Sequence, residues 1–126
     1  LEFRRVLFRS VEVMAGMTRD PLFGPLIAFG LGGIHVEILG DVQFRVAPLT
    51  DHDANEMVKG IKGHRLLQGY RGTAAADMKA LEEILLRISR LVETIPEISQ
   101  LDMNPVFALA QGRGCRIVDA RIRISG

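Results

Sequence analysis

The chain is 126 residues long, with 48% apolar and 25% charged residues, a composition that suits one compact domain with its own core. Its longest mostly apolar run, residues 25–34, contains glycines and is far shorter than the roughly 20 residues of a membrane helix, which excludes a membrane-spanning segment. The formal charge is +1, and without the first ten residues 13 basic residues face 14 acidic ones, so a nucleic-acid-binding surface is not expected.

The first ten residues, LEFRRVLFRS, do not continue into the regular pattern that begins at Val11. A coding sequence for them resembles a widely used sequencing adapter read through in frame, so we expect residues 1–10 to be a translated adapter and residues 11–126 to be a truncated natural domain. A basic amphipathic arm or the start of a signal peptide is the alternative, but Arg9 interrupts the apolar stretch and no cleavage site follows. The single cysteine, Cys115, suits a reducing cytoplasm.

Four strands are predicted in the first 50 residues. Apolar and polar residues alternate with period two from Val11, which predicts a strand over 11–16, and turn-forming residues follow over 18–24. The apolar runs 26–29 and 34–39 bracket three glycines, which favours a hairpin. A phosphate-binding loop is the alternative, but a strand rather than a helix follows these glycines. The fourth strand spans 42–47.

Two helices are predicted. Thr50 is a typical N-cap, two aspartates follow in the first turn, and this short helix should end at about Lys59. A longer helix is predicted over residues 75–95, because apolar residues recur there at spacings of three and four and form one stripe. Pro96 marks its end.

An antiparallel hairpin is predicted in the last part of the chain, with strands over 101–109 and 115–124 joined through residues 111–114. Strands lie before and after the long helix without a regular alternation of strand and helix. The sequence therefore predicts the α+β class, with a mainly antiparallel sheet packed against one long and one short helix.

Three polar side chains of this hairpin are candidates for a metal site. Asp102 and Asn104 are two residues apart and therefore project from one face of a strand. A loop centred on 111–114 places Asp119 near Asn104 on the second strand. Hard oxygen ligands of this kind suit Mg²⁺, which uses one or two carboxylates together with substrate phosphates and waters. The alternative is that these side chains satisfy nearby turns or backbone groups, and on spacing alone both interpretations stay open.

Several segments together resemble a known family: VEVMAGMTRDPLFGPLIAFGLGGIHVEILGDVQFRVAPL, LLQGYRG, LDMNPVF and VDARIRI. They are similar to the C-terminal part of the ATP-grasp domain of NDP-forming acyl-CoA synthetases, the ADP-forming acetate-CoA ligases. They are more distantly similar to the nucleotide-binding subunit of succinyl-CoA synthetase. The resemblance covers nearly all of residues 11–124 and implies the C-terminal subdomain of an ATP-grasp fold. One departure is Arg65, where this family is expected to have a proline, and we expect it to affect only a loop.

The resemblance implies a role for four residues. Asn104 and Asp119 stand where the family coordinates the Mg²⁺ of the nucleotide. Asp102 stands where the succinyl enzyme has a glutamate that faces its phosphohistidine, which makes it the candidate catalytic residue. Glu12 resembles the residue that contacts the ribose or adenine edge of ATP or ADP.

The reaction implied is acid + CoA + ATP to acyl-CoA + ADP + phosphate, run through a phosphohistidine. The implied partners are the nucleotide ATP or ADP, and the CoA-binding and phosphohistidine-bearing domains or subunit. This sequence contains neither of those domains, so the fragment alone is expected to be inactive. A synthetase-like regulatory region of a protein acetyltransferase fusion and a plain interaction module are the alternatives. The acyl substrate, the oligomeric state and the roles of Glu37, Arg45 and Arg71 stay open.

Overall fold

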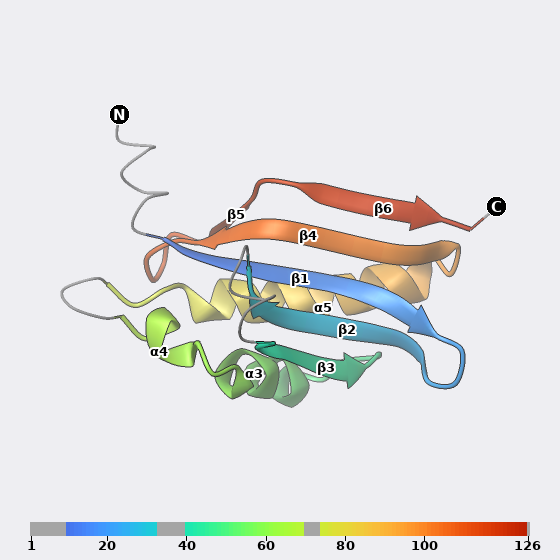
Figure 1. Cartoon of the computed structure of the whole chain (residues 1–126), viewed down its shortest axis with the longest axis horizontal. Coiled ribbons are helices and arrows are strands. Elements are labelled where there is room, and N and C mark those ends of the chain that lie inside the picture. Colours follow the sequence, from blue (N-terminus) through green and yellow to red (C-terminus); the bar gives the residue numbers. More distant parts are fainter. Residues whose placement is uncertain (1–9, 33–39, 70–73, 126) are drawn as a thin grey trace.

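The computed structural model describes residues 10–32, 40–69 and 74–125. The described chain forms one six-stranded antiparallel sheet, and α5 packs against β1, β2 and β4 on one of its faces (Figure 1). The elements in chain order are β1 (Val11–Asp20), β2 (Gly24–Leu31), β3 (Val42–Val46), α3 (Asp51–Gly60), α4 (His64–Leu67), α5 (Met78–Thr94), β4 (Ile98–Ala108), β5 (Cys115–Ile117) and β6 (Ala120–Ile124). The predicted α+β class with a mainly antiparallel sheet is confirmed.

The strand order is β3-β2-β1-β4, with β5 and β6 both paired to the other edge of β4. The central ladder joins β1 to β4, and its register shifts between Val13 and Ala15. At this shift β4 places Asn104 and Pro105 opposite Met14 alone, which is a β-bulge. The bulge lies in the segment that carries two of the predicted site residues.

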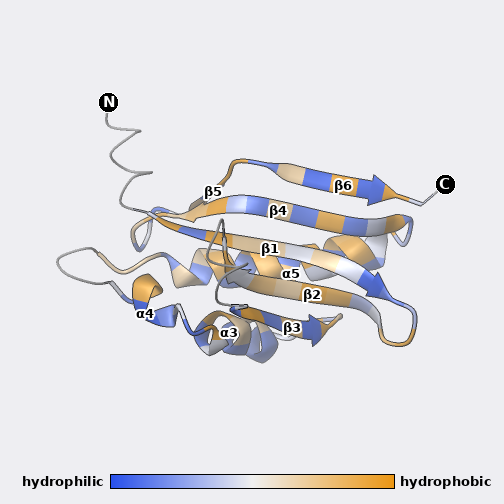
Figure 2. Cartoon of the chain, in the orientation of Figure 1, coloured by the Kyte–Doolittle hydropathy of each residue, from blue (hydrophilic) through white to orange (hydrophobic). Residues whose placement is uncertain are grey.

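The core lies between the sheet and α5. Residues of β1 alternate in burial: Val13, Ala15 and Met17 are buried and belong to the core, while Glu12 and Met14 on the other face are only partly buried. The predicted apolar stripe of α5 supplies the opposing side, with these fully buried residues: Leu81, Leu85, Ile88 and Val92. Figure 2 shows these apolar stretches along β1, β2 and α5. The opposite face of the sheet has no helix packed on it among the described residues.

The predicted start of the short helix is confirmed. Thr50 is the N-cap of α3: its hydroxyl accepts a hydrogen bond from the Asp53 backbone N–H at 3.1 Å, and the Asp53 carboxylate accepts one from the Thr50 N–H at 2.9 Å. Hydrogen bonds from the Thr50 backbone N–H and from its side-chain hydroxyl hold the pKa of the Asp53 carboxyl below its ordinary value. The long helix starts at Met78 rather than at Ala75, because Asp77 caps it.

The predicted turn over 18–24 is too long. The strand β1 continues through Asp20, since Thr18 pairs with Leu26 and Asp20 pairs with Gly24 across the hairpin. The turn itself is held by the Asp20 carboxylate, which accepts hydrogen bonds from the backbone N–H groups of Leu22 and Phe23 at 2.8 and 3.0 Å. Backbone pairing with β2 thus extends the strand into residues of turn-forming type.

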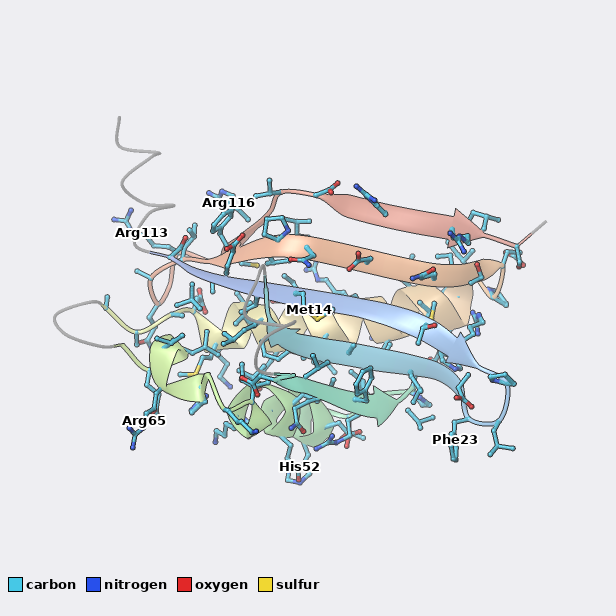
Figure 3. The ribbon with its side chains drawn as sticks, viewed as in Figure 1. Met14, Phe23, His52, Arg65, Arg113 and Arg116 are labelled. Atoms are coloured by element: carbon cyan, nitrogen blue, oxygen red, sulfur yellow. The ribbon has the colours of Figure 1, made fainter. Side chains whose placement is uncertain are left out.

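Three other details differ from the sequence analysis or lie outside it. The one-turn helix α4 was not predicted, and Arg65 lies in it rather than in a loop, exposed and directed away from the sheet (Figure 3). The hairpin strand predicted over 34–39, Glu37 and Arg71 fall outside the described residues. Over its described length, β2 pairs with β1 on one edge and with β3 on the other. No helix in the described ranges is long and apolar enough to cross a membrane.

Candidate functional site

The predicted site residues gather on the sheet face opposite the helices, which we call the open face. Leu101 and Met103 of β4 pack into the core, so Asp102 and Asn104, which alternate with them, lie on the open face. Glu12 reaches the same face from β1, because its neighbour Val13 is buried in the core. Met14, labelled near the middle of the sheet in Figure 3, lies across from Asn104 and Pro105 of β4.

Asn104 and Asp119 lie directly opposite each other, as the predicted register required. The Asn104 backbone N–H donates to the Asp119 carbonyl oxygen at 3.1 Å, and the pairs Val106–Ile117 and Met103–Ala120 flank them in the same register. Asp119 lies in the gap between β5 and β6, so it belongs to neither strand, contrary to the single strand predicted over 115–124. Its side chain is 52% exposed, which leaves the carboxylate accessible from the open face.

Gly32 completes this corner of the site, although the sequence analysis gave it only a turn role. Its backbone N–H donates to the Glu12 carbonyl oxygen at 2.9 Å. A Cβ atom at Gly32 would lie 2.9 Å from the Val13 carbonyl oxygen and 3.1 Å from Asn104 Oδ1. Only glycine therefore fits here without displacing backbone or the Asn104 amide. Gly32, just after β2, thus lies between the Glu12 backbone of β1 and the Asn104 side chain of β4.

Asp102 lies one step along β4 from that corner. It pairs with Gly16 of β1 on one side and with Arg121 of β6 on the other, and it is partly buried. Gly16 has no side chain, and a Cβ there would lie 2.5 Å from the Leu101 carbonyl oxygen. The glycine therefore lets the β1 backbone approach β4 closely beside Asp102, while Arg121 supplies positive charge across the strand.

The donor set at Asn104 and Asp119 fits a magnesium ion. An amide oxygen and a carboxylate are hard oxygen ligands, and Mg²⁺ completes its coordination with phosphates and waters rather than with further side chains. Within the described ranges, no three His, Cys, Asp or Glu side chains gather as a metal site. The Arg121 Nε atom lies 3.7 Å from Asp119 Oδ2, and an exposed ion pair of this length is worth at most about 1 kcal/mol, which a divalent cation can outcompete.

Asp77 holds the far end of this hairpin, and the sequence analysis did not identify it. One carboxylate oxygen caps α5 by accepting from the Ala80 N–H at 3.2 Å. The other accepts from the N–H groups of Gly112 and Gly114 in the β4–β5 turn, at 3.1 and 2.8 Å. The predicted hairpin connection at 111–114 is thereby tied to the helix. Burial, together with the nearby Asp77 charge, raises the pKa of the half-buried Cys115 thiol.

Arg45, whose role the sequence left open, belongs to the fold rather than to the site. Its partner on β2 is Ile27, a core residue, so it lies on the helix side of the sheet. It forms an ion pair with Glu56 of α3 at 3.7 Å and donates to the Phe44 carbonyl oxygen at 2.7 Å. Two hollows of about 460 and 340 Å³ run along α5, also on the helix side and away from the open face, and both include Leu86 and Arg90.

Comparison with known proteins places this geometry in a family. The family model described as "ATP-grasp domain" matches residues 3–124. The chain is 48% identical over 116 residues to the beta subunit of acetate–CoA ligase (ADP-forming) II from Pyrococcus furiosus, covering 91% of this chain and 49% of that subunit. It is 49% identical over 111 residues to 4-hydroxybutyrate–CoA ligase (ADP-forming) from Nitrosopumilus maritimus, covering 88% of this chain and 16% of that protein.

A solved structure matches at the level of the fold as well. The dinucleotide-forming acetyl-coenzyme A synthetase 1 of Ca. Korarchaeum cryptofilum, in complex with coenzyme A and Mg-AMPPCP, has a TM-score of 0.85 and 46% identity, covering 90% of this chain and 53% of that chain. This chain thus spans about half the length of the beta subunits and of the solved chain that it matches. The chain belongs to the ATP-grasp domain family, as a C-terminal part of the domain found in ADP-forming acyl-CoA ligases.

Proposed function

We propose that this chain supplies the nucleotide- and magnesium-binding half of an ATP-grasp domain in an NDP-forming acyl-CoA synthetase. The overall reaction is acid + CoA + ATP to acyl-CoA + ADP + phosphate, through a phosphohistidine carried by another domain or subunit. The observation that carries the proposal is the corner of the open face where Asn104 lies across from Asp119 and beside Gly32 and Glu12. It is supported by the relatives named as ADP-forming ligases.

Each site residue then has a distinct task. Asn104 Oδ1 and the Asp119 carboxylate would hold Mg²⁺, which when bound neutralises charge on the nucleotide phosphates. Glu12, at the start of β1, would accept hydrogen bonds from the ribose or from the adenine edge. Asp102, a short step along β4, would accept a hydrogen bond from the imidazole of the phosphohistidine and so orient its ring. The partly buried position of Asp102 strengthens that hydrogen bond relative to one in water.

The open face needs a second wall to enclose a nucleotide. A flat sheet face buries little of a ligand compared with a cleft, and the described open face offers few cations for the phosphates. We therefore expect the 126-residue chain alone to bind MgATP weakly and to hydrolyse none. Isothermal titration calorimetry with MgATP tests this half-site, and a dissociation constant in the micromolar range would contradict it.

The acyl substrate is set elsewhere. The identity of the chain to its relatives does not follow the acid: it is 48% and 38% for two ligases both named for acetate, 49% for one named for 4-hydroxybutyrate and 34% for a trans-feruloyl-CoA synthase. A region that determined the acid would differ more between ligases for acids of such different size. We propose that the acid and CoA are bound by the phosphohistidine-bearing and CoA-binding partners.

The metal assignment is tested in the complete enzyme by measuring phosphohistidine formation from ATP against magnesium concentration, normalised to folded protein. Asn104→Ala and Asp119→Ala should each lower the rate at least about a hundredfold. Asp102→Asn should slow histidine phosphorylation while leaving the magnesium dependence of nucleotide binding nearly unchanged. The matched control is Glu83→Gln, which removes an exposed carboxylate on the helix side and should leave the rate unchanged. A wild-type rate in Asp119→Ala would end the metal assignment.

A further inference from the structure

The strand β6 forms an exposed edge of the sheet. All five of its residues are exposed, and within the described ranges it pairs only with β4. The carbonyl oxygens of Asp119 and Arg123 accept from Asn104 N–H and Ser99 Oγ, and the N–H of Ser125 donates to Glu97, so the odd-numbered residues turn their peptide groups towards β4. In an antiparallel ladder the alternate residues, Ala120, Ile122 and Ile124, then direct theirs outward.

An apolar ledge lies beside this edge on the helix side of the sheet. Ile117, Ile122 and Ile124 pair with the core residues Val106, Leu101 and Ile98, so their side chains lie on the same face as the core. They are nevertheless 47%, 53% and 58% exposed, because α5 packs beneath β1, β2 and β4 and leaves this margin uncovered. This ledge, made of Ile117, Ile122 and Ile124, is therefore an exposed apolar strip that is continuous with the buried core.

The opposite face of β6 carries two cations, and Figure 2 shows the resulting alternation along the strand. Arg121 pairs across β4 with Asp102, and Arg123 with Gln100. If two copies of β6 paired antiparallel in one continuous sheet, every register that pairs three or more residues of the two strands would place an arginine directly opposite another arginine, which is unfavourable. The charge pattern thus disfavours pairing between two β6 strands. It favours a partner strand with carboxylates opposite Arg121 and Arg123.

From these observations we propose that β6 is a docking edge for an extended segment of a partner polypeptide in which acidic and apolar residues alternate. The segment would add a strand to the sheet by pairing with the outward peptide groups of β6. Its carboxylates would face Arg121 and Arg123, and its apolar side chains would cover Ile122 and Ile124. The inference stands on the edge geometry and charge pattern, independently of the nucleotide site.

The test uses the 126-residue chain and a seven-residue peptide of alternating valine and glutamate, with binding followed by backbone amide NMR shifts. Peptide-dependent shifts should be largest at Ala120, Ile122 and Ile124. A matched peptide with lysine in place of glutamate should bind about tenfold more weakly. The double variant Arg121→Glu with Arg123→Glu should reverse this preference. Equal binding of the two peptides, an unreversed preference in the variant, or shifts confined to other strands would each overturn the proposal.

Two further variants separate edge pairing from simple charge attraction. Ile122→Pro removes an outward N–H and no ladder bond, so the fold should persist while binding of the glutamate peptide falls at least about tenfold. Arg123→Pro removes an inward N–H and should destabilise the sheet itself. Undiminished binding in Ile122→Pro would overturn strand addition, and if that variant fails to fold, the position of the peptide-dependent amide shifts along β6 of the unaltered chain still decides. Concentration-dependent dimerisation of the chain through β6 in sedimentation experiments would also overturn the proposal.

Discussion

Replacing Gly16 by alanine should strongly destabilise the domain, because β1 and β4 approach each other closely at this point. A Cβ atom on Gly16 would lie 2.5 Å from the Leu101 carbonyl oxygen and 3.4 Å from the Asp102 Cα atom. Real Cβ atoms stay at least 3.0 Å from such neighbours, so the central ladder must separate or twist to admit the methyl group. Both opposing atoms belong to the backbone and cannot rotate away. We expect a loss of about 3 kcal/mol, at the upper end of the usual range for overpacking.

The matched control is Gly60→Ala at the end of α3. Its Cβ would meet only the amide end of the Gln43 side chain, at 3.0 to 3.4 Å, which can move away. Alanine also favours the helix by up to about 1 kcal/mol, so this variant should be nearly neutral or slightly stabilised. The free energies of unfolding would be measured by urea denaturation followed by far-ultraviolet circular dichroism. A loss below about 1 kcal/mol for Gly16→Ala, or equal losses for both variants, would refute the steric reasoning.

Three other predictions concern the helix caps and the first ten residues. Asp77→Ala removes the cap of α5 and the one carboxylate oxygen that accepts from both Gly112 and Gly114 in the β4–β5 turn, and it should cost about 2–3 kcal/mol in urea unfolding; a loss below about 0.5 kcal/mol would show that water replaces these bonds. Hydrogen bonds from the Thr50 backbone N–H and side-chain hydroxyl lower the pKa of Asp53, so the stability it contributes is present above its ordinary pKa of about 4 and is lost as the pH falls below it. Asp53→Asn should flatten stability against pH in that range, and equal slopes would contradict this. Removing residues 1–10 should change the unfolding free energy by less than about 1 kcal/mol, and a larger loss would show that this segment, where the family match begins at residue 3, is part of the fold.

Local patterns in the sequence predicted the elements whose stability is itself local. The N-cap at Thr50, the apolar stripe of α5 and the register that puts Asp119 opposite Asn104 were all recovered, because each depends on residues close together in the chain. The register followed from the length of one turn, and it placed the two proposed metal ligands correctly relative to each other.

Features set by distant strands were not predictable in the same way. The extension of β1 to Asp20 depends on pairing with β2, which overrides the turn preference of the residues involved. The contact between Gly32 and Asn104 depends on the β1–β4 bulge, which no periodicity reveals. Asp77 is of a residue type common at helix N-caps, and its second role is not visible in the sequence. Only the tertiary structure brings the β4–β5 turn within reach of its second carboxylate oxygen.

The position of β1 between β2 and β4 also has a kinetic consequence. The β1–β2 pairing and the pairing of β4 with β5 and β6 close short loops, whereas the β1–β4 ladder joins the first twenty residues to the stretch after α5. Closing the longest loop costs the most chain entropy, so the β1–β4 ladder, which is the seam between the two hairpins, should form late in folding. Gly32 and Asn104 come from opposite sides of the seam and meet only when it is complete. The nucleotide corner would therefore be absent from partly folded chains that already contain both hairpins.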